Sequence, residues 1–384
     1  MEAYFDNSAT TRCYEEVKDI VVKTMTGDFG NPSAMHKKGV EAEQYVKEAA
    51  QKLARILKVS EKEILFTSGG TESDNLALIG GAMANKRMGN HIITTAVEHA
   101  AVGQPVAFLK EQGFEVTILP VDERGVVKMD ALREALRPDT ILVSTMFVNN
   151  EVGAVMPVEE IGSLVHEKSP KALYHVDAIQ AFGKYRIYPK KWGIDLLSVS
   201  AHKIHGPKGA GFLYINSKAK VQPMILGGGQ QGGMRSGTDN VPGIAGLGVA
   251  AEKIYTNLEE KQEHLYQLKE RMAAGLEEIG DVIINGMPLR EGAPQILSVS
   301  FTGIRSEVLL HTLEEKDIYI SAGSACSSHK RKASSTLSAM GMSAAQMECT
   351  VRMSFSEENT FEEVDYCLGV LREVLPILKR YARR

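Results

Sequence analysis

Lys203 has surroundings that are unusual for a lysine. It follows the apolar run 194–200 and precedes the turn 204–209, which contains two glycines and a proline. The run is typical of a buried strand that ends at the turn, and polar groups at the carboxyl ends of strands form the sites of open α/β sheets. An amine held there, beside His202, loses its proton more easily and can attack a carbonyl carbon. Lys203 is therefore predicted to form a Schiff base.

A carboxylate can lie beside that lysine, because the strand-like run 172–176 ends in Asp177. Pyridoxal phosphate needs this combination of residues. A lysine holds its aldehyde, and an acid keeps the pyridine nitrogen protonated so that the ring acts as an electron sink. An isolated Asp177 would more often cap the next helix. Together with Lys203 and a phosphate loop, Asp177 favours the cofactor.

The candidate phosphate loop covers 67–74, between the strand-like run 64–66 and an apolar-periodic helix. Gly69 and Gly70 let backbone amides approach an anion, which a helix N-terminus attracts. Thr71 and Asp74 also have the spacing of a capping box, so an ordinary helix start is the alternative. The segment 227–232 matches Gly-x-Gly-x-x-Gly, but it follows no full strand and opens no helix, so no dinucleotide site is predicted there.

Two further side chains could contact a ligand. His99 comes just after the strand-like run 91–95, where an imidazole could stack on a flat ring or transfer protons, although a lone histidine is more often structural. Arg352 lies in the alternating run 351–355, where its fork could hold a carboxylate. A structural ion pair is an equal alternative for this arginine.

Cys326 lies in a segment of small residues, 321–329, that contains no acid. The basic residues that follow, 329–332, produce a positive field, which lowers the pKa of a thiol and raises its thiolate fraction. We therefore expect an accessible, reactive thiol on a mobile loop. The alternative is a buried or incidental cysteine, as expected for Cys367, which belongs to a patterned helix.

Alternating elements must position these residues. Between 62 and 214, seven strand-like runs alternate with helix-like stretches: 63–67, 91–95, 115–119, 140–145, 172–177, 195–200 and 211–215. This order predicts a mostly parallel sheet covered by helices on both faces. A long, highly charged helical pattern, 246–279, then resembles a bridge between two lobes. The rest predicts a smaller α+β unit, with strands at 281–285, 295–301 and 317–321 and helices at 306–315 and 361–381.

The length and composition fit this organisation. A chain of 384 residues exceeds what a single core usually supports, which predicts a large cofactor-binding domain, 15–255, and a small domain, 1–14 plus 256–384, that carries Cys326. Hydrophobic residues make up 43%, charged residues 24%, and the net charge is -4. These values argue against a basic nucleic-acid-coating surface and against a disordered acidic chain.

Cellular location and cysteine chemistry are also constrained. The first six residues lack the basic and apolar stretches of a secretory signal, and no apolar run is long enough to span a membrane, so we expect a cytoplasmic protein. The four cysteines, at 13, 326, 349 and 367, contain no Cys-x-x-Cys pair. This spacing argues against a disulfide framework and against a zinc site.

Over nearly its whole length the chain resembles the cysteine desulfurases of the class V aminotransferase group. The resemblance rests on motifs in order at 4–11, 29–32, 67–73, 98–99, 148–153, 175–180, 200–209, 234–238, 323–327 and 351–352. It implies the α/β fold of type I pyridoxal phosphate enzymes, a mostly parallel seven-stranded sheet flanked by helices with a smaller α+β domain. Gln231 and Gly232 depart from it, because relatives usually carry an acid and a basic residue there.

The resemblance also implies roles for individual residues. Lys203 would form the Schiff base with pyridoxal phosphate, Asp177 would contact the pyridine nitrogen, and His99 would stack on the ring and transfer protons. The other implied contacts are Gln180 to the ring oxygen, Gly70, Thr71, Ser200 and His202 to the phosphate, Thr238 from the neighbouring subunit, and Asn150 and Arg352 on the substrate carboxylate, with Asn150 also contacting the cofactor.

The implied reaction converts L-cysteine to L-alanine. The Lys203 amine removes the α-proton, and the Cys326 thiolate takes the sulfur as a persulfide. The resemblance implies a homodimer and a sulfur-acceptor protein, either an iron-sulfur scaffold or a tRNA-thiolation enzyme. It implies no metal and no direct contact with nucleic acid or membrane. A selenocysteine lyase or a small-amino-acid aminotransferase on the same fold is an alternative. A catalytically idle sulfur-relay or cofactor-binding protein is another, disfavoured because Lys203 and Asp177 are both present.

Overall fold

The computed structural model describes residues 1–322 and 334–382. A seven-stranded sheet lies at its centre, in the order β2 (Ile64–Thr67), β8 (Gly211–Ile215), β7 (Leu196–Ser200), β6 (Leu173–Asp177), β5 (Thr140–Met146), β3 (His91–Thr95) and β4 (Glu115–Leu119). The five strands from β7 to β4 are parallel, and β8 is antiparallel to both of its neighbours. Each strand-like run between 62 and 214 therefore forms a strand, and the prediction of a mostly parallel sheet is confirmed.

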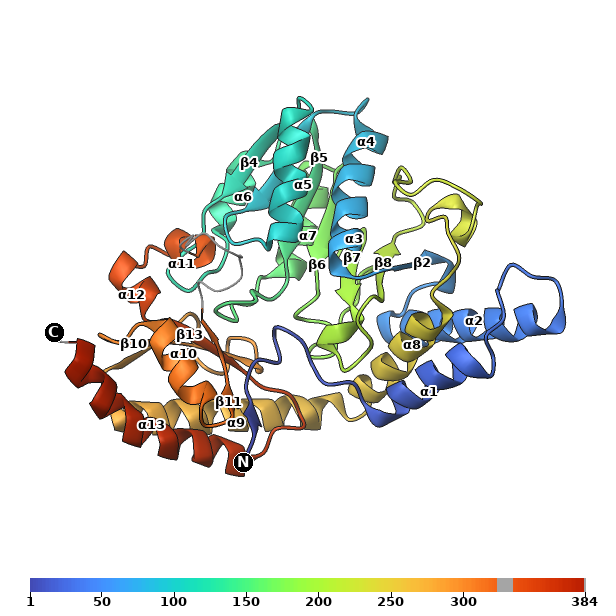
Figure 1. Cartoon of the computed structure of the whole chain (residues 1–384). Helices are drawn as coiled ribbons and strands as arrows, with labels where there is room; N and C mark the ends of the chain where they lie inside the picture. The colour runs from blue at the N-terminus through green and yellow to red at the C-terminus, as the bar shows by residue number, and fades with distance from the viewer. Residues whose placement is uncertain (323–333, 383–384) are drawn as a thin grey trace.

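Consecutive residues of each strand face opposite helical layers. On β6, Leu173 packs in one core with residues 76–82, which follow helix α3 (Gly70–Asn75), and with α5 (Ala100–Glu111), whereas Tyr174 packs with α7 (Val158–Lys168). A π-helical turn, η2 (Leu76–Gly80), links α3 to α4 (Gly81–Asn85), and α6 (Met129–Ala135) follows β4. Figure 1 shows α3, α4 and α5 in front of the sheet and α7 behind it. The same alternation places residues 173, 175 and 177 on the face that α3 and α5 cover.

The predicted long helix over 246–279 is wrong, because the structure has two helices there. Helix α8 (Val241–Tyr255) packs against α1 (Glu15–Thr26) and α2 (Lys37–Leu57), and α9 (Leu258–Ile279) begins a new direction. Asn257, between them, has a φ of 54°, a left-handed conformation that asparagine tolerates and that ends a helix. The two helices belong to different hydrophobic cores.

A second sheet lies in the C-terminal part. Its order is β12 (Ser321–Ala322), β13 (Thr350–Ser354), β10 (Ile296–Phe301) and β9 (Val282–Asn285), with antiparallel neighbours. The helices of this part are α9, α10 (Ser306–Glu314), α11 (Ser335–Ala339), α12 (Ala344–Glu348) and α13 (Phe361–Ala382). The single strand predicted over 317–321 is wrong. The segment divides into β11 (Ile318–Tyr319) and β12, which belong to different sheets.

The N-terminus joins this C-terminal part. Strand β1 (Ala3–Tyr4) pairs in parallel with β11, and Phe5 belongs to the core formed by α9, β10, β13 and α13. In Figure 1 the blue N-terminus lies beside α9 and α13. The separate core favours the proposed division into a large domain and a small domain built from both ends of the chain.

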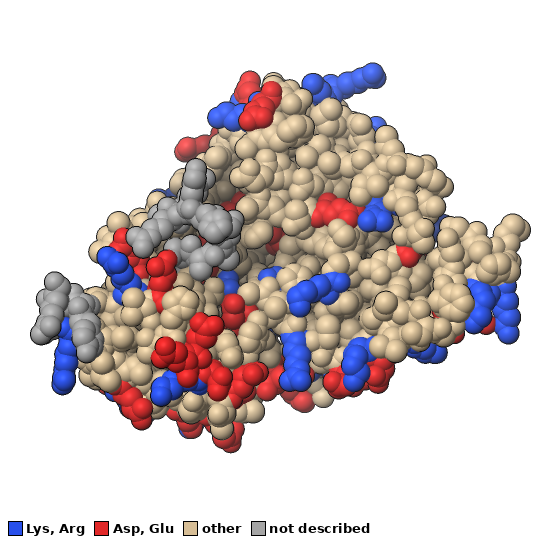
Figure 2. Space-filling view, in the orientation of Figure 1, with Lys and Arg blue, Asp and Glu red and all other residues tan. Residues whose placement is uncertain are grey.

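Charged side chains are unevenly distributed on the surface. Figure 2 shows acidic side chains gathered over the lower part of the molecule, where α9 and α13 lie, while much of the sheet-bearing part is uncharged on this face. Within the described ranges 1–322 and 334–382, no helix is long and apolar enough to cross a membrane.

Candidate active site

The ends of two neighbouring strands bring the predicted lysine and acid together. Asp177 is the last residue of β6, and Ser200 is the last residue of β7, which pairs in parallel with β6. Lys203 ends the short 3-10 helix η3 (Ala201–Lys203) that follows β7 directly. Parallel neighbours place their carboxyl ends at one edge of a sheet, so both residues lie where α/β enzymes form their sites.

The Lys203 amine is held by the N-terminal segment. Its Nζ donates to the carbonyl oxygens of Ser8 and Ala9, the latter at 2.7 Å. Gln180 Nε2 donates to the same Ser8 oxygen at 3.0 Å. The Ser8 carbonyl therefore accepts hydrogen bonds from two residues that are predicted to contact the cofactor, Lys203 and Gln180. The Lys203 amine would have to leave this oxygen in order to react with an aldehyde.

Asp177 is a buried carboxyl with few partners. Its side chain is 5% exposed, and Oδ1 accepts a hydrogen bond from the Ile179 amide at 2.9 Å. Burial first, and then the nearby charge of Asp74, raises the pKa of Asp177 well above its ordinary range. An ionised carboxylate here lacks compensation, which makes the site suitable for a ligand that carries a positive charge or a proton.

The phosphate-loop candidate lies against the end of β7. A Cβ built on Gly69 would lie 3.6 Å from Ser200 Oγ, and one on Gly70 would collide with the Ile179 side chain at 2.1 Å. His202 Nδ1 lies 3.2 Å from the Thr10 hydroxyl, and burial with two nearby lysines lowers the pKa of His202 to about 4. A neutral imidazole can still donate one N–H to an anion.

The capping-box interpretation of this loop is wrong. Helix α3 begins at Gly70, its N-cap residue is Gly69, and no side chain caps it. Thr71 therefore lies inside the first turn, with an exposed side chain, and Asp74 is fully buried. Thr71 is free to contact a ligand at the helix start.

Replacing Gly69 by alanine should weaken the binding of pyridoxal phosphate about ten-fold, because strain of about 1–3 kcal/mol is expected at such a backbone conformation. Gly69 has a φ of 149° and a ψ of -171°, a combination that is essentially restricted to glycine. The dissociation constant, measured by fluorescence titration of the cofactor-free protein, tests this. Gly103→Ala on α5, where a Cβ meets nothing within 4 Å, is the matched control. Equal affinities for both variants would contradict the expectation.

His99 lies beside the same loop. It caps α5, and its Nδ1 accepts a hydrogen bond from the Ala101 amide at 3.1 Å, so Nε2 carries the proton in the neutral ring. His99 and Thr71 line one cavity of about 610 Å³ together with α5 and Met224. The structure thus brings the predicted ring-stacking residue next to the predicted phosphate contact.

Arg352 lies on β13 and is 7% exposed. Its Nη2 binds Asp6 Oδ1 at 2.7 Å, and Nη1 donates to the backbone oxygen of Asn150 at 2.8 Å. Its Nε is buried and has no hydrogen-bond partner in the described part of the chain. The structural ion pair is therefore present, and one buried donor remains for a ligand carboxylate. Asn150 is brought to Arg352 through its main chain.

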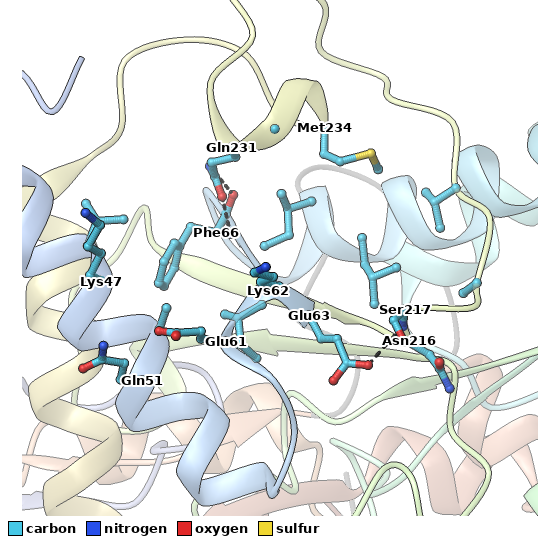
Figure 3. Close-up of a pocket in the computed structure, with 18 residues that line it drawn as sticks. Lys47, Gln51, Glu61, Lys62, Glu63, Phe66, Asn216, Ser217, Gln231 and Met234 are labelled. Carbon is cyan, nitrogen blue, oxygen red and sulfur yellow. Dashed lines mark hydrogen bonds between the residues drawn. The ribbon is translucent and has the colours of Figure 1, made fainter. Parts of the chain in front are cut away.

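Thr238 is exposed at the end of a long segment that follows β8. Figure 3 shows how this segment is tied down: the Gln231 side chain accepts from the Phe66 amide at 2.7 Å and donates to the Phe66 oxygen at 3.0 Å. Gln231, Met234 and the edge of β2 line a cavity of about 650 Å³. Gln231 thus covers the open edge of the sheet. The contact of Thr238 with a neighbouring subunit stays a prediction.

A second anchor joins this segment to the phosphate loop. Glu72 accepts from the Ser68 amide at 2.9 Å and pairs with Arg235 Nε at 3.0 Å. The turn η4 (Gln231–Gly233) is not flanked by a strand and a helix, in agreement with the rejection of a dinucleotide loop at 227–232.

Some residues near the site were given no role from the sequence. Asp6, Ser8 and Ala9 belong to the motif 4–11, but they act through a main-chain carbonyl or an ion pair that only the fold creates. Glu98 belongs to the motif 98–99 beside His99, and Asp74 follows the motif 67–73, and these positions were the available indications. Cys326 lies outside the described residues. Cys367 is fully buried, as predicted for a core cysteine.

The described side chains fit pyridoxal phosphate. They provide an amine, a buried acid with uncompensated charge, and a glycine loop with hydroxyl and imidazole groups beside it. A planar cation with an aldehyde and a phosphate satisfies each of these groups.

Comparison with known proteins identifies the family to which the chain is similar. A family model described as aminotransferase class-V matches residues 3–367. The cysteine desulfurase IscS of Methanosarcina thermophila is 45% identical over 376 residues, which cover 98% of this chain and 92% of that protein. A solved structure of a NifS-like protein has a TM-score of 0.93 and 40% identity, covering 98% of this chain and all of that one. The structure of SspA in complex with cysteine has a TM-score of 0.80 and 32% identity, over 93% and 100% of the two chains.

Proposed function

The chain belongs to the class-V aminotransferase family, and from this premise we propose that it is a cysteine desulfurase that uses pyridoxal phosphate. The substrate is L-cysteine and the products are L-alanine and a sulfur atom held by the enzyme. The observation that carries the proposal is the placement of Lys203 and Asp177 at the carboxyl ends of adjacent parallel strands, beside a glycine loop.

The cofactor, when bound, withdraws electrons from the substrate and makes its α-proton acidic. Lys203 would hold the aldehyde of the cofactor, and its free amine would take and return the α-proton of the substrate. Asp177 keeps the ring nitrogen protonated, and Gln180 binds the ring oxygen. Ser200, His202 and the loop with Gly70 and Thr71 bind the phosphate, while His99 covers the ring and assists proton transfer.

The substrate carboxylate would be held by Arg352. The Asp6 pair and the Asn150 carbonyl fix the guanidinium in position, and the buried Nε provides the open donor. A charge-assisted hydrogen bond orients the amino acid, so that its α-proton faces Lys203.

Replacing Arg352 by lysine should raise the KM for L-cysteine about ten-fold and change kcat little, because the loss of one hydrogen bond to a charged group costs about 1.5–3 kcal/mol. Lysine retains the positive charge, but it lacks the planar guanidinium that holds Nε, Nη1 and Nη2 in fixed directions. Steady-state alanine formation measures both constants. Arg271→Lys is the control. This exposed arginine on α9 forms a bidentate pair with Asp365 near the start of α13. An unchanged KM in Arg352→Lys would count against a carboxylate role.

The sulfur would pass to Cys326. Its thiolate would attack the substrate's sulfur, and the electron pair of the broken carbon–sulfur bond would stay with the substrate carbon, which takes up a proton. The enzyme would keep the persulfide, and alanine would leave. An acceptor protein then takes this sulfur, either an iron-sulfur scaffold or a tRNA-thiolation enzyme. The enzyme would act as a homodimer in which Thr238 contributes to the neighbouring phosphate site.

The test is a product assay on the purified, cofactor-loaded protein. L-cysteine with a thiol reductant should give alanine and sulfide in equal amounts and no keto acid. Keto acid formed with consumption of an amino acceptor would identify an aminotransferase instead. Selenocysteine consumed far faster than cysteine would identify a selenocysteine lyase.

A further inference from the structure

A row of buried polar side chains lies behind Asp177 on the sheet face covered by α3 and α5. His175 on β6 stands at its centre, with Nδ1 2.8 Å from Ser144 Oγ on β5 and Nε2 2.9 Å from Ser198 Oγ on β7. His175 precedes Asp177 by two residues, so both side chains leave the strand on the same face. The three members of the row, Ser144, His175 and Ser198, are each at most 2% exposed.

Asp74 closes this row from α3. It is 0% exposed, and in the described part of the chain neither carboxyl oxygen has a hydrogen bond of normal geometry, although the Ser198 hydroxyl lies close enough to favour the ionised form slightly. Its Oδ1 lies 3.5 Å from His175 Nε2. A buried carboxylate without donors is costly, whereas the protonated acid can offer its O–H to the imidazole nitrogen. The geometry thus favours a neutral Asp74 beside a neutral His175.

The charges around Asp74 agree with this arrangement. Burial lowers the pKa of His175 to about 4, so the imidazole is uncharged near neutrality. Burial raises the pKa of Asp74 to about 7, and only the Ser198 hydroxyl lowers it. Glu98, in the turn before α5, has a pKa raised by burial to about 8 and interacts with both Asp74 and Asp177. His99, next to it, lowers the pKa of Asp177.

We propose that Asp74 is a positioning residue for Asp177. It is a neutral acid below about neutral pH, and above it Asp74 would add a second negative charge near Asp177, which would strengthen the hold of Asp177 on a protonated ring nitrogen. The proposal rests on the proposed cofactor. Its consequence is that cofactor affinity persists to a higher pH than a single buried aspartate would allow.

The test compares wild type with Asp74→Asn, which keeps the shape and hydrogen bonds but does not ionise. The dissociation constant of pyridoxal phosphate and the absorption spectrum of the loaded protein are followed from about pH 6 to pH 9.5. Below Asp74's titration the two proteins should agree. Above it, the variant should bind the cofactor more weakly, on the order of ten-fold, because one nearby charge shifts a pKa by about one unit.

Two results would overturn the proposal. Superimposable profiles over the whole range would show that Asp74 exerts no charge on the ring, and a difference already present at pH 6 would show that it is ionised from the start. Glu98 interacts with Asp74, so Glu98→Gln is placed in both backgrounds, and the difference that Asp74→Asn causes should persist without the Glu98 carboxyl. Glu63→Gln, which removes another buried carboxyl paired with Lys190 on the far edge of the sheet, should follow the wild-type profile.

Asp74→Ser removes the same charge with a smaller side chain and gives the same expectation should the asparagine variant be unstable. These measurements contain no substrate. A negative result therefore leaves the proposed reaction standing, whereas a wild-type protein that binds no cofactor at any pH would count against the proposed function itself.

Discussion

Lys203→Ala should lower the turnover of L-cysteine by at least about 10³-fold, because one side chain provides both the nucleophile for the cofactor and the base for the α-proton. Lys203 follows the end of β7, which pairs with the strand that ends in Asp177, and its amine donates to the Ser8 and Ala9 carbonyls. Alanine keeps the backbone but provides neither function. The cofactor should also lose its covalent attachment, which is read as the loss of the visible band of the loaded enzyme.

Two variants separate this chemistry from charge and from folding. Lys203→Arg retains a cation that can reach the Ser8 carbonyl, but guanidinium does not form the covalent link, so it should be as inactive as alanine. Lys208→Ala removes an exposed lysine five residues later and should retain activity. Substantial turnover by Lys203→Ala, with a visible band intact, would place the covalent link on another lysine.

Cys326→Ser is the second variant with a very large expected effect. It should retain the visible band and bind L-cysteine, yet release sulfide at least about 10²-fold more slowly, because a hydroxyl neither ionises near neutral pH nor accepts sulfur. Sulfide release and alanine formation are measured together. A protein-bound persulfide, trapped by alkylation and detected by mass, should be present in wild type and missing in the variant.

Cys13→Ser and Cys349→Ser are the matched controls, since both are free thiols among the described residues. Burial raises the pKa of Cys13, so it is poorly suited to nucleophilic attack at neutral pH. Normal sulfide release from Cys326→Ser would remove the persulfide step while leaving Lys203 and Asp177 in their proposed roles.

Short continuous apolar runs, separated by helix-like stretches, made the central sheet predictable. Runs such as 173–177 and 196–200 are buried on both faces. Asp177 and Lys203 lie at or just after their carboxyl ends, so the sequence alone predicted the place of both residues in the sheet. The reaction depends on residues at strand ends, where local sequence determines position. This is why the roles of Lys203 and Asp177 could be predicted from their positions after the apolar runs.

Features that depend on distant partners were not predictable in the same way. The break at Asn257 lies within a charged, helix-compatible sequence, and only the need of α8 and α9 to reach separate cores explains it. The division of 317–321 depends on pairing with β1 at one end and β13 at the other. Asp74 had the spacing of a capping residue, and its true surroundings come from β6 and β7.

The placement of the N-terminal segment has a consequence for the order of assembly. Residues 3–8 are synthesised before their partners, because they bond to Tyr319 and Ser354, and the Ser8 carbonyl accepts a hydrogen bond from Lys203. The partners of Phe5 are synthesised more than 250 residues later. A nascent chain must therefore carry an apolar strand without its core for most of its synthesis, a condition that exposes it to aggregation or to chaperones. The Lys203 amine reaches its resting position only after the N-terminal segment has met partners far along the chain, so the site that we propose for the cofactor would be completed late in folding.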